Sequence, residues 1–103
     1  MKRRWIVLPL ALAAAWPVGA QDAAALQLRS LAATCANCHG TDGRAVQGSS
    51  VPALAGMPKA QMLAQLKALR DGSRPATVMH QIAKGYTEAQ LDQIAGYFAA
   101  QKK

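Results

Sequence analysis

The segment CANCH, residues 35–39, holds both cysteines of the chain and one of its two histidines. Side chains at positions i, i+3 and i+4 share one face of a helix. Cys35, Cys38 and His39 are therefore expected to point the same way from a single turn. A disulfide between cysteines three positions apart would close too small a loop to constrain the unfolded chain usefully. We expect the three side chains to serve one ligand instead.

The pattern Cys-x-x-Cys-His is the attachment signature of c-type haem. Each thiol adds to one vinyl group of the same porphyrin, and the adjacent imidazole becomes the proximal ligand of the iron. The motif predicts one covalently attached haem c, bound through Cys35 and Cys38, with His39 as an axial ligand.

Two other kinds of site use the same residue types. A structural zinc site needs four ligands, and besides the motif the chain offers only the distant His80 and no second cysteine pair. A thioredoxin-like redox pair expects a βαβ context, yet no stretch alternates apolar and polar residues long enough to predict a strand. Haem attachment remains the favoured interpretation.

The first twenty residues read as a secretory signal peptide. Positive residues at 2–4 precede an apolar run over 5–16, and the small residues Val18-Gly19-Ala20 suit signal peptidase. We expect cleavage after Ala20, export to the periplasm, and a mature domain over 21–103. The apolar run is short for a membrane span, which takes about 20 residues. An uncleaved anchor is the alternative.

The net charge limits the kinds of binding partner we expect, and the small number of aromatic residues limits the size of the hydrophobic core. The net charge of +7 falls to +4 when the three signal-peptide charges are removed. The remaining positive residues are scattered, whereas nucleic-acid binding favours a basic stripe. We expect no nucleic-acid partner and a mild preference for acidic ones. A domain this small often needs a disulfide, a metal or a cofactor to stabilise it. The mature chain has only three aromatic residues, and a haem would add the apolar surface that they cannot supply.

The mature chain reads as helices joined by one long loop, so we predict an all-α fold of about four helices around the haem. Asp22 is expected to cap a first helix that runs toward Thr34. The glycine-rich stretch 40–56 is expected to be a loop. Further helices are predicted over 58–72, over 76–84, and after the capping-box start Thr87-x-x-Gln90.

Three methionines of the mature chain compete for the other axial position. Met62 fits the apolar face of its helix, and Met57 lies in a Gly-Met-Pro turn. We favour Met79, which lies forty residues beyond His39, enough chain to pass round the porphyrin edge. Reach alone does not exclude Met57. A methionine ligand raises the reduction potential.

His80 is the alternative to its neighbour Met79. On a helix the two side chains point about 100° apart, so only one of them can face the iron. The face of His80 runs toward the polar Lys84. A surface histidine is therefore the favoured interpretation, with axial ligation kept as the alternative.

Several segments resemble class I cytochromes c. TCANCHGTDG (34–43) is similar to the haem site of that family, and VPALAG (51–56) resembles its Pro-x-Leu-x-Gly segment. The resemblance implies that the carbonyl of Pro52 accepts a hydrogen bond from His39. It also implies a monohaem cytochrome c fold, and it covers essentially all of the mature chain.

A narrower resemblance lies in RPATVMHQIAKGYTEAQLDQIAGYFAAQ, residues 74–101. This segment is similar to the cytochrome subunit of flavocytochrome c sulfide dehydrogenase. In that family the haem subunit accepts electrons from a flavoprotein that oxidises sulfide. The resemblance implies a flavoprotein dehydrogenase as the redox partner of this chain.

These features together predict a periplasmic electron carrier rather than an enzyme, with no stable membrane span after signal cleavage. Two alternatives stay open. One is a freely diffusing monohaem cytochrome c that serves another redox protein. The other is a ligand-binding or peroxidatic haem protein whose sixth coordination site is open.

Overall fold

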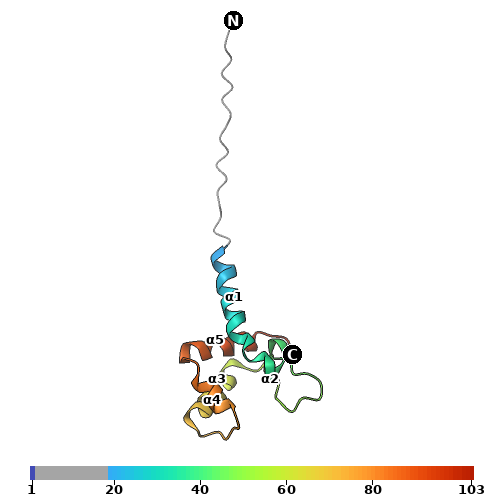
Figure 1. The fold of residues 1–103 in the computed structure, drawn as a ribbon, viewed down its shortest axis with the longest axis vertical. Coiled ribbons are helices and arrows are strands. Elements are labelled where there is room, and N and C mark those ends of the chain that lie inside the picture. The colour runs from blue at the N-terminus through green and yellow to red at the C-terminus, as the bar shows by residue number, and fades with distance from the viewer. Residues whose placement is uncertain (2–18) are drawn as a thin grey trace.

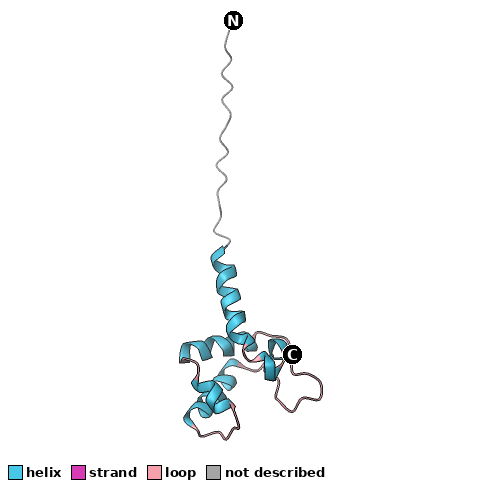
Figure 2. Ribbon diagram, in the orientation of Figure 1, coloured by secondary structure: helices cyan, strands magenta, loops and turns pink. Residues whose placement is uncertain are grey.

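The computed structural model describes Met1 and residues 19–103. Apart from Met1, Gly19 and Ala20, the predicted signal peptide lies outside the described residues. Within 19–103 the chain is helical and contains no strand (Figure 2), as the all-α prediction requires. The elements are α1 (Gly19–Ala33), α2 (Ala36–His39), the 3₁₀ turn η1 (Thr41–Gly43), α3 (Lys59–Asp71), α4 (Met79–Lys84) and α5 (Glu88–Ala99).

Two helix starts differ from the prediction. Helix α1 begins at Gly19, so Asp22 lies in its first turn instead of capping it, where a carboxylate still suits the helix dipole. Helix α4 begins only at Met79 and has six residues. The residues before it, Thr77 and Val78, are β-branched and lose side-chain freedom in a helix. The short helix therefore lacks its expected first turn.

Two predicted helix ends are confirmed. The capping box at the start of α5 is complete, because Thr87 accepts a hydrogen bond from the Gln90 amide and the Gln90 side chain accepts one from the Thr87 amide. Helix α3 stops at Gly72, whose φ of 84° lies in the left-handed region. Glycine adopts this conformation without the steric cost that a Cβ brings.

Helix α5 is the element that joins the two sides of the fold. It packs against α1 and against α3, while α4 packs on α3 and α2 packs on α1 and η1. Figure 1 shows α2 on one side and the α3–α4 pair on the other. The core cluster lies where α1, α3 and α5 meet and contains Ala32, Met62, Ile94, Ala95 and Phe98.

Helices α1 and α5 pack against each other, and Leu31 and Tyr97 both pack against the core cluster. Among residues 19–103, no helix has both the length and the apolar character needed to cross a bilayer.

Candidate haem site

The CANCH segment forms a single helical turn. The amide of His39 donates to the Cys35 carbonyl at 2.9 Å, and the amide of Gly40 donates to Ala36 at 2.9 Å. Both cysteines are free thiols, Cys35 part-buried and Cys38 exposed. Burial raises the pKa of the Cys35 thiol, and a hydrogen bond with Thr34 partly offsets the rise. The turn thus presents two unreacted sulfurs and an imidazole together.

The imidazole of His39 is buried, with 7% of its surface exposed, and its orientation is set by one hydrogen bond. Its Nδ1 lies 2.7 Å from the carbonyl oxygen of Pro52, which is the contact that the family resemblance implied. Because a carbonyl can only accept, the ring proton resides on Nδ1. The lone pair of the neutral ring is then on Nε2, which is the form that binds a metal ion.

The loop that carries Pro52 is tied down at Gly43. The Gly43 carbonyl accepts hydrogen bonds from the amides of Leu54 at 2.8 Å and Ala55 at 3.1 Å. Gly43 has a φ of 75°, and a Cβ there would lie 2.8 Å from both the Ala55 nitrogen and the Phe98 ring. Only glycine combines this conformation with so close an approach, and this approach fixes the loop beside His39.

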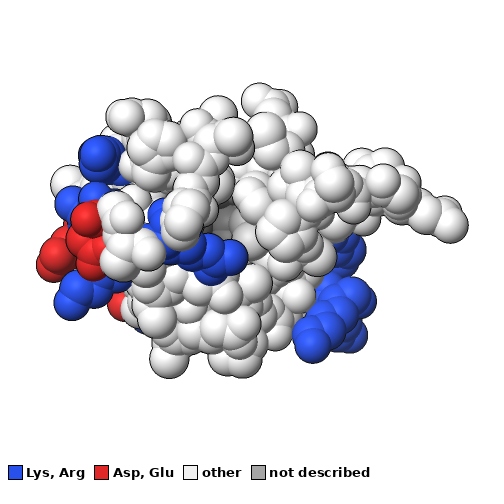
Figure 3. Space-filling model, turned by 90° about the horizontal axis from the view of Figure 1, so that it is seen from below, with Lys and Arg blue, Asp and Glu red and all other residues white. Residues whose placement is uncertain are grey.

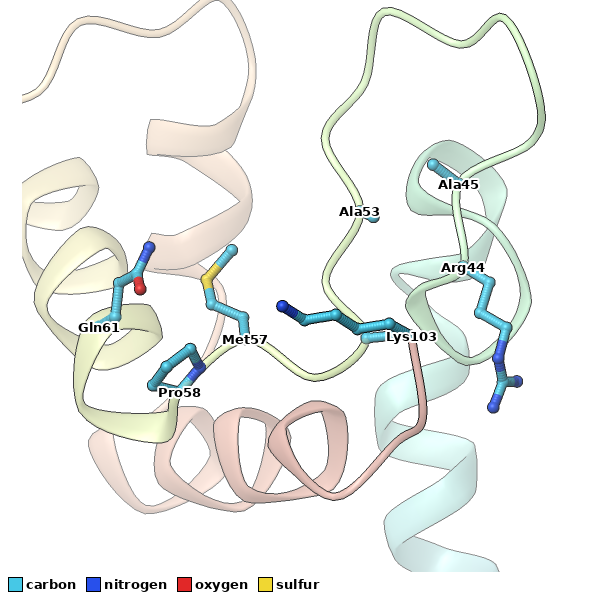
Figure 4. A pocket seen from close by; sticks show the side chains of 8 residues that line it. Arg44, Ala45, Ala53, Met57, Pro58, Gln61 and Lys103 are labelled. Atoms are coloured by element: carbon cyan, nitrogen blue, oxygen red, sulfur yellow. The ribbon is translucent and has the colours of Figure 1, made fainter.

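The three methionines have different surroundings. Met62 is a core residue, 4% exposed. Met57 packs against the core cluster and lines a pocket of about 550 Å³ together with Pro58 and Lys103 (Figure 4). Met79 is part-buried and is the first residue of α4. It therefore belongs to the α3–α4 side of the fold, and its role as an axial ligand stays a prediction.

His80 is less solvated than its polar neighbours indicated. It is only partly exposed, and its Nδ1 is buried without a hydrogen-bond partner among the described residues. Such an unpaired nitrogen is uncommon in proteins. His80 therefore stays the alternative to Met79 as the ligand from α4.

The described residues fit a covalently bound haem better than a directly bound metal ion. Within residues 19–103, no group of three or more His, Cys, Asp or Glu side chains is placed to hold an ion. Two large apolar side chains of the α4 region, Val78 and Ile82, are 56% and 41% exposed. A porphyrin face is the kind of apolar surface that would cover them. The free thiols and the available Nε2 of His39 complete the match.

Two side-chain contacts near the site were not predicted. The hydroxyls of Thr34 and Tyr86 lie 2.6 Å apart, and Tyr97 donates to Asp42 at 2.5 Å. The Asp42 carboxylate, as the acceptor, raises the pKa of Tyr97, and burial adds to the rise. Asp42 has a φ of 53° in the turn η1. Both contacts join residues more than fifty positions apart, so no local pattern could have indicated them.

Comparison with known proteins places the chain in a family. The cytochrome c family profile matches residues 28–102. The cytochrome subunit of sulfide dehydrogenase from Chlorobaculum tepidum is 41% identical over 68 residues, which is 66% of this chain and 60% of that protein. The thiosulfate dehydrogenase electron acceptor of Thiomonas intermedia is 43% identical over 70 residues, 65% of this chain and 32% of that protein.

A shorter relative matches over most of its own length. Cytochrome c-554(548) of Halomonas halodenitrificans is 35% identical over 72 residues, which is 67% of this chain and 86% of that protein. By contrast, the match spans 60% or less of the Chlorobaculum and Thiomonas proteins.

Proposed function

Because the chain belongs to the cytochrome c family, as a class I c-type cytochrome, we propose that it is the haem subunit that accepts electrons from a flavoprotein dehydrogenase oxidising sulfide. Electron transfer itself is the function of the family. The haem c, when bound, supplies an iron that changes its charge by one electron. The polypeptide carries out no bond-making reaction of its own in this proposal.

The observation that carries the haem-binding part of the proposal is the orientation of His39. The ring is buried, its Nδ1 proton is committed to Pro52, and its Nε2 is left for the iron. Cys35 and Cys38 beside it would hold the porphyrin through two thioethers. Met79 of α4 would supply the second axial ligand, and a methionine ligand favours the reduced iron. Filled axial positions suit electron transfer, whereas ligand binding needs an open one.

Two relatives support a sulfur-oxidising dehydrogenase as partner. One is named as the cytochrome subunit of sulfide dehydrogenase, and another as the electron acceptor of thiosulfate dehydrogenase. The segment 74–101, which carries the proposed distal ligand, resembles the cytochrome subunit of flavocytochrome c sulfide dehydrogenase.

Surface charge suits a transient contact with an acidic partner. In the face shown in Figure 3, the acidic side chains lie at one end among Lys and Arg side chains, and further Lys and Arg side chains lie near the middle and at the opposite end of a mostly uncharged surface. The net charge of residues 21–103 is positive, so attraction would speed the encounter at low salt.

A freely diffusing carrier is the second candidate. The match to cytochrome c-554(548) over 86% of that protein favours it, because a protein of about this domain's length carries the same sequence features. The two candidates differ in partner and share the same site. In both, the signal-like residues 1–20 direct the chain to the periplasm.

The test is to express the full chain in a bacterium that matures c-type cytochromes and to recover it by periplasmic release. We expect a mass equal to the chain from Gln21 plus one haem, and a c-type spectrum after denaturation in alkaline pyridine. Carbon monoxide should leave the ferrous spectrum unchanged, and rapid binding would indicate the open-site alternative. Colourless, folded protein of peptide mass would overturn the proposal.

The partner is tested by gentle purification from the source organism. A flavin-containing chain that elutes with this one in a constant ratio, and that transfers electrons from sulfide to it, supports the dehydrogenase assignment. The isolated cytochrome with sulfide alone is the control for direct chemical reduction. Elution as a lone monomer that any of several donors reduces would favour the free carrier.

A further inference from the structure

We infer that Tyr86 is a positioning residue that fastens α4, and with it the axial ligand on α4, to the cysteine-bearing side of the site through Thr34. The inference rests on the proposed function, because it assumes a haem held at Cys35 and a distal ligand from α4. It adds a residue outside the attachment motif and outside the ligand set.

The contact joins the two sides of the fold. Tyr86 follows the C-terminal end of α4, and its amide donates to the Ala83 carbonyl at 3.4 Å. Its hydroxyl lies 2.6 Å from that of Thr34, the residue that directly precedes Cys35. Helix α4 otherwise packs on α3. The hydrogen bond therefore links the end of the ligand helix to the start of the haem-binding turn.

The direction of this hydrogen bond follows from a third group. The Thr34 hydroxyl donates to the Leu31 carbonyl at 2.9 Å, and a hydroxyl has only one proton to donate. Tyr86 must therefore be the donor and Thr34 the acceptor. The Thr34 oxygen also lies 3.9 Å from the Cys35 sulfur. Thr34 is thus held from two directions, which makes it a defined anchor for the tyrosine.

Helix α4 is short and depends on contacts with the rest of the fold for its stability. It has six residues, and its N-cap, Val78, makes no side-chain hydrogen bond, so the helix is too short to be stable by itself. Tyr86 is part-buried and packs against the core cluster. Loss of its hydroxyl should let α4 move away more readily, and an external ligand should then replace the protein ligand more easily.

The experiment is an imidazole titration of the ferric holoprotein, followed by loss of the sulfur-to-iron charge-transfer band. One hydrogen bond of ordinary strength corresponds to a change of about fivefold, so Tyr86→Phe should raise the apparent imidazole affinity by about that factor. Thr34→Val should do the same, and the double variant should do no more than either. Thr34→Ser keeps the hydroxyl and should match the native protein.

Tyr97→Phe is the matched control. Tyr97 is also part-buried and also donates to a side chain, but its acceptor is Asp42 in the turn η1. We expect its imidazole affinity to stay within about twofold of the native value, because that bond does not reach α4. Equal changes for Tyr86→Phe and Tyr97→Phe, or no change for either, would overturn the inference.

Amide hydrogen exchange supplies a readout that does not depend on redox activity. The amides of Ile82 and Gly85 in and after α4 should exchange about fivefold faster in Tyr86→Phe, while that of Leu69 in α3 should not. If the native protein carries haem but lacks the sulfur band, the ligand is reassigned to His80. The exchange comparison then decides whether Tyr86 fastens α4. Absence of covalent haem from the native protein overturns the proposed function as well.

Discussion

The segment from Cys35 to Gly56 and the segment from Met79 to Tyr86 are held in place by different means. In the first, His39 is buried and bonded to Pro52, and the Gly43 carbonyl ties the loop down with two backbone hydrogen bonds. In the second, α4 packs on α3, and the Tyr86 hydroxyl that follows it lies 2.6 Å from that of Thr34. The proposed proximal ligand, His39, is fixed by its own neighbourhood, whereas the proposed distal ligand on α4 would depend on packing with α3 and on Tyr86.

Because of this difference, the two segments should respond differently to substitution. Substitutions near CANCH should remove the haem or destabilise the fold. Substitutions around α4 should leave the haem attached and change the iron's ligation or potential. The following predictions test that division, beginning with the largest effect.

The largest effect is expected from Cys35→Ala combined with Cys38→Ala. With no thiol left, no thioether can form, and denatured protein should have the mass of the peptide alone. Cys38→Ala by itself is the control, because one thioether through Cys35 should still hold the haem. Haem that survives denaturation in the double variant would show that attachment does not use the motif.

Met79→Ala should keep the haem and lose the ferric sulfur band. Axial ligands set haem potentials over a span of about 0.8 V, and we expect the potential to fall by about 0.1–0.3 V, since a methionine ligand raises it. Spectroelectrochemical titration measures the change. Met57→Ala is the matched control and should change neither property. The reverse result would identify Met57 as the ligand and would show that α4 carries no axial ligand.

Gly40→Ala should destabilise the proximal side by about 3 kcal/mol. Gly40 has a φ of 86°, and a Cβ would lie 1.9 Å from the Arg44 carbonyl oxygen. Gly48→Ala is the control, since its φ is 82° but no atom lies within 4 Å of the added Cβ, and it should cost about 1 kcal/mol. Chemical unfolding of the holoproteins measures both. Equal losses would mean that backbone strain alone matters and the close approach does not.

Tyr97→Phe should have the smallest effect, about 1 kcal/mol at neutral pH. It keeps the edge-to-face contact with Phe98, whose ring centroid is 5.3 Å away, so only the hydroxyl is tested. Hydrogen bonding to Asp42 raises the pKa of Tyr97. The stability that this bond contributes is therefore present below the unfolded pKa of about 10. It is lost as the pH rises through the folded pKa.

The difference in stability between the two proteins should therefore begin to shrink above about pH 10 and disappear once the pH exceeds the raised pKa of folded Tyr97, as thermal unfolding at a series of pH values would show. A difference that persists unchanged in strong alkali would assign the loss to packing instead of the hydrogen bond.

The helical class, the haem attachment turn, the C-terminal end of α3 and the start of α5 could all be predicted from the amino-acid sequence. Each of these depends on residues within one or two turns of each other: the spacing of CANCH, the Thr87–Gln90 capping box, and the glycine at 72. Local rules of helix geometry and backbone conformation are sufficient for such features. The carbonyl of Pro52 was indicated by family resemblance, because nothing in the spacing of the chain itself points to it.

The arrangement of α4 and the residues around it became visible only in the three-dimensional structure. This structure shortened α4 to Met79–Lys84, buried a nitrogen of His80, and brought Tyr86 to Thr34 across 52 positions. Contacts of this kind depend on how α3, α4 and α5 pack, and packing sums many small apolar contacts over the whole chain. No short sequence pattern encodes that sum. The sequence therefore indicated that the segment around Met79 supplies the second ligand, but not how that segment packs against the rest of the fold.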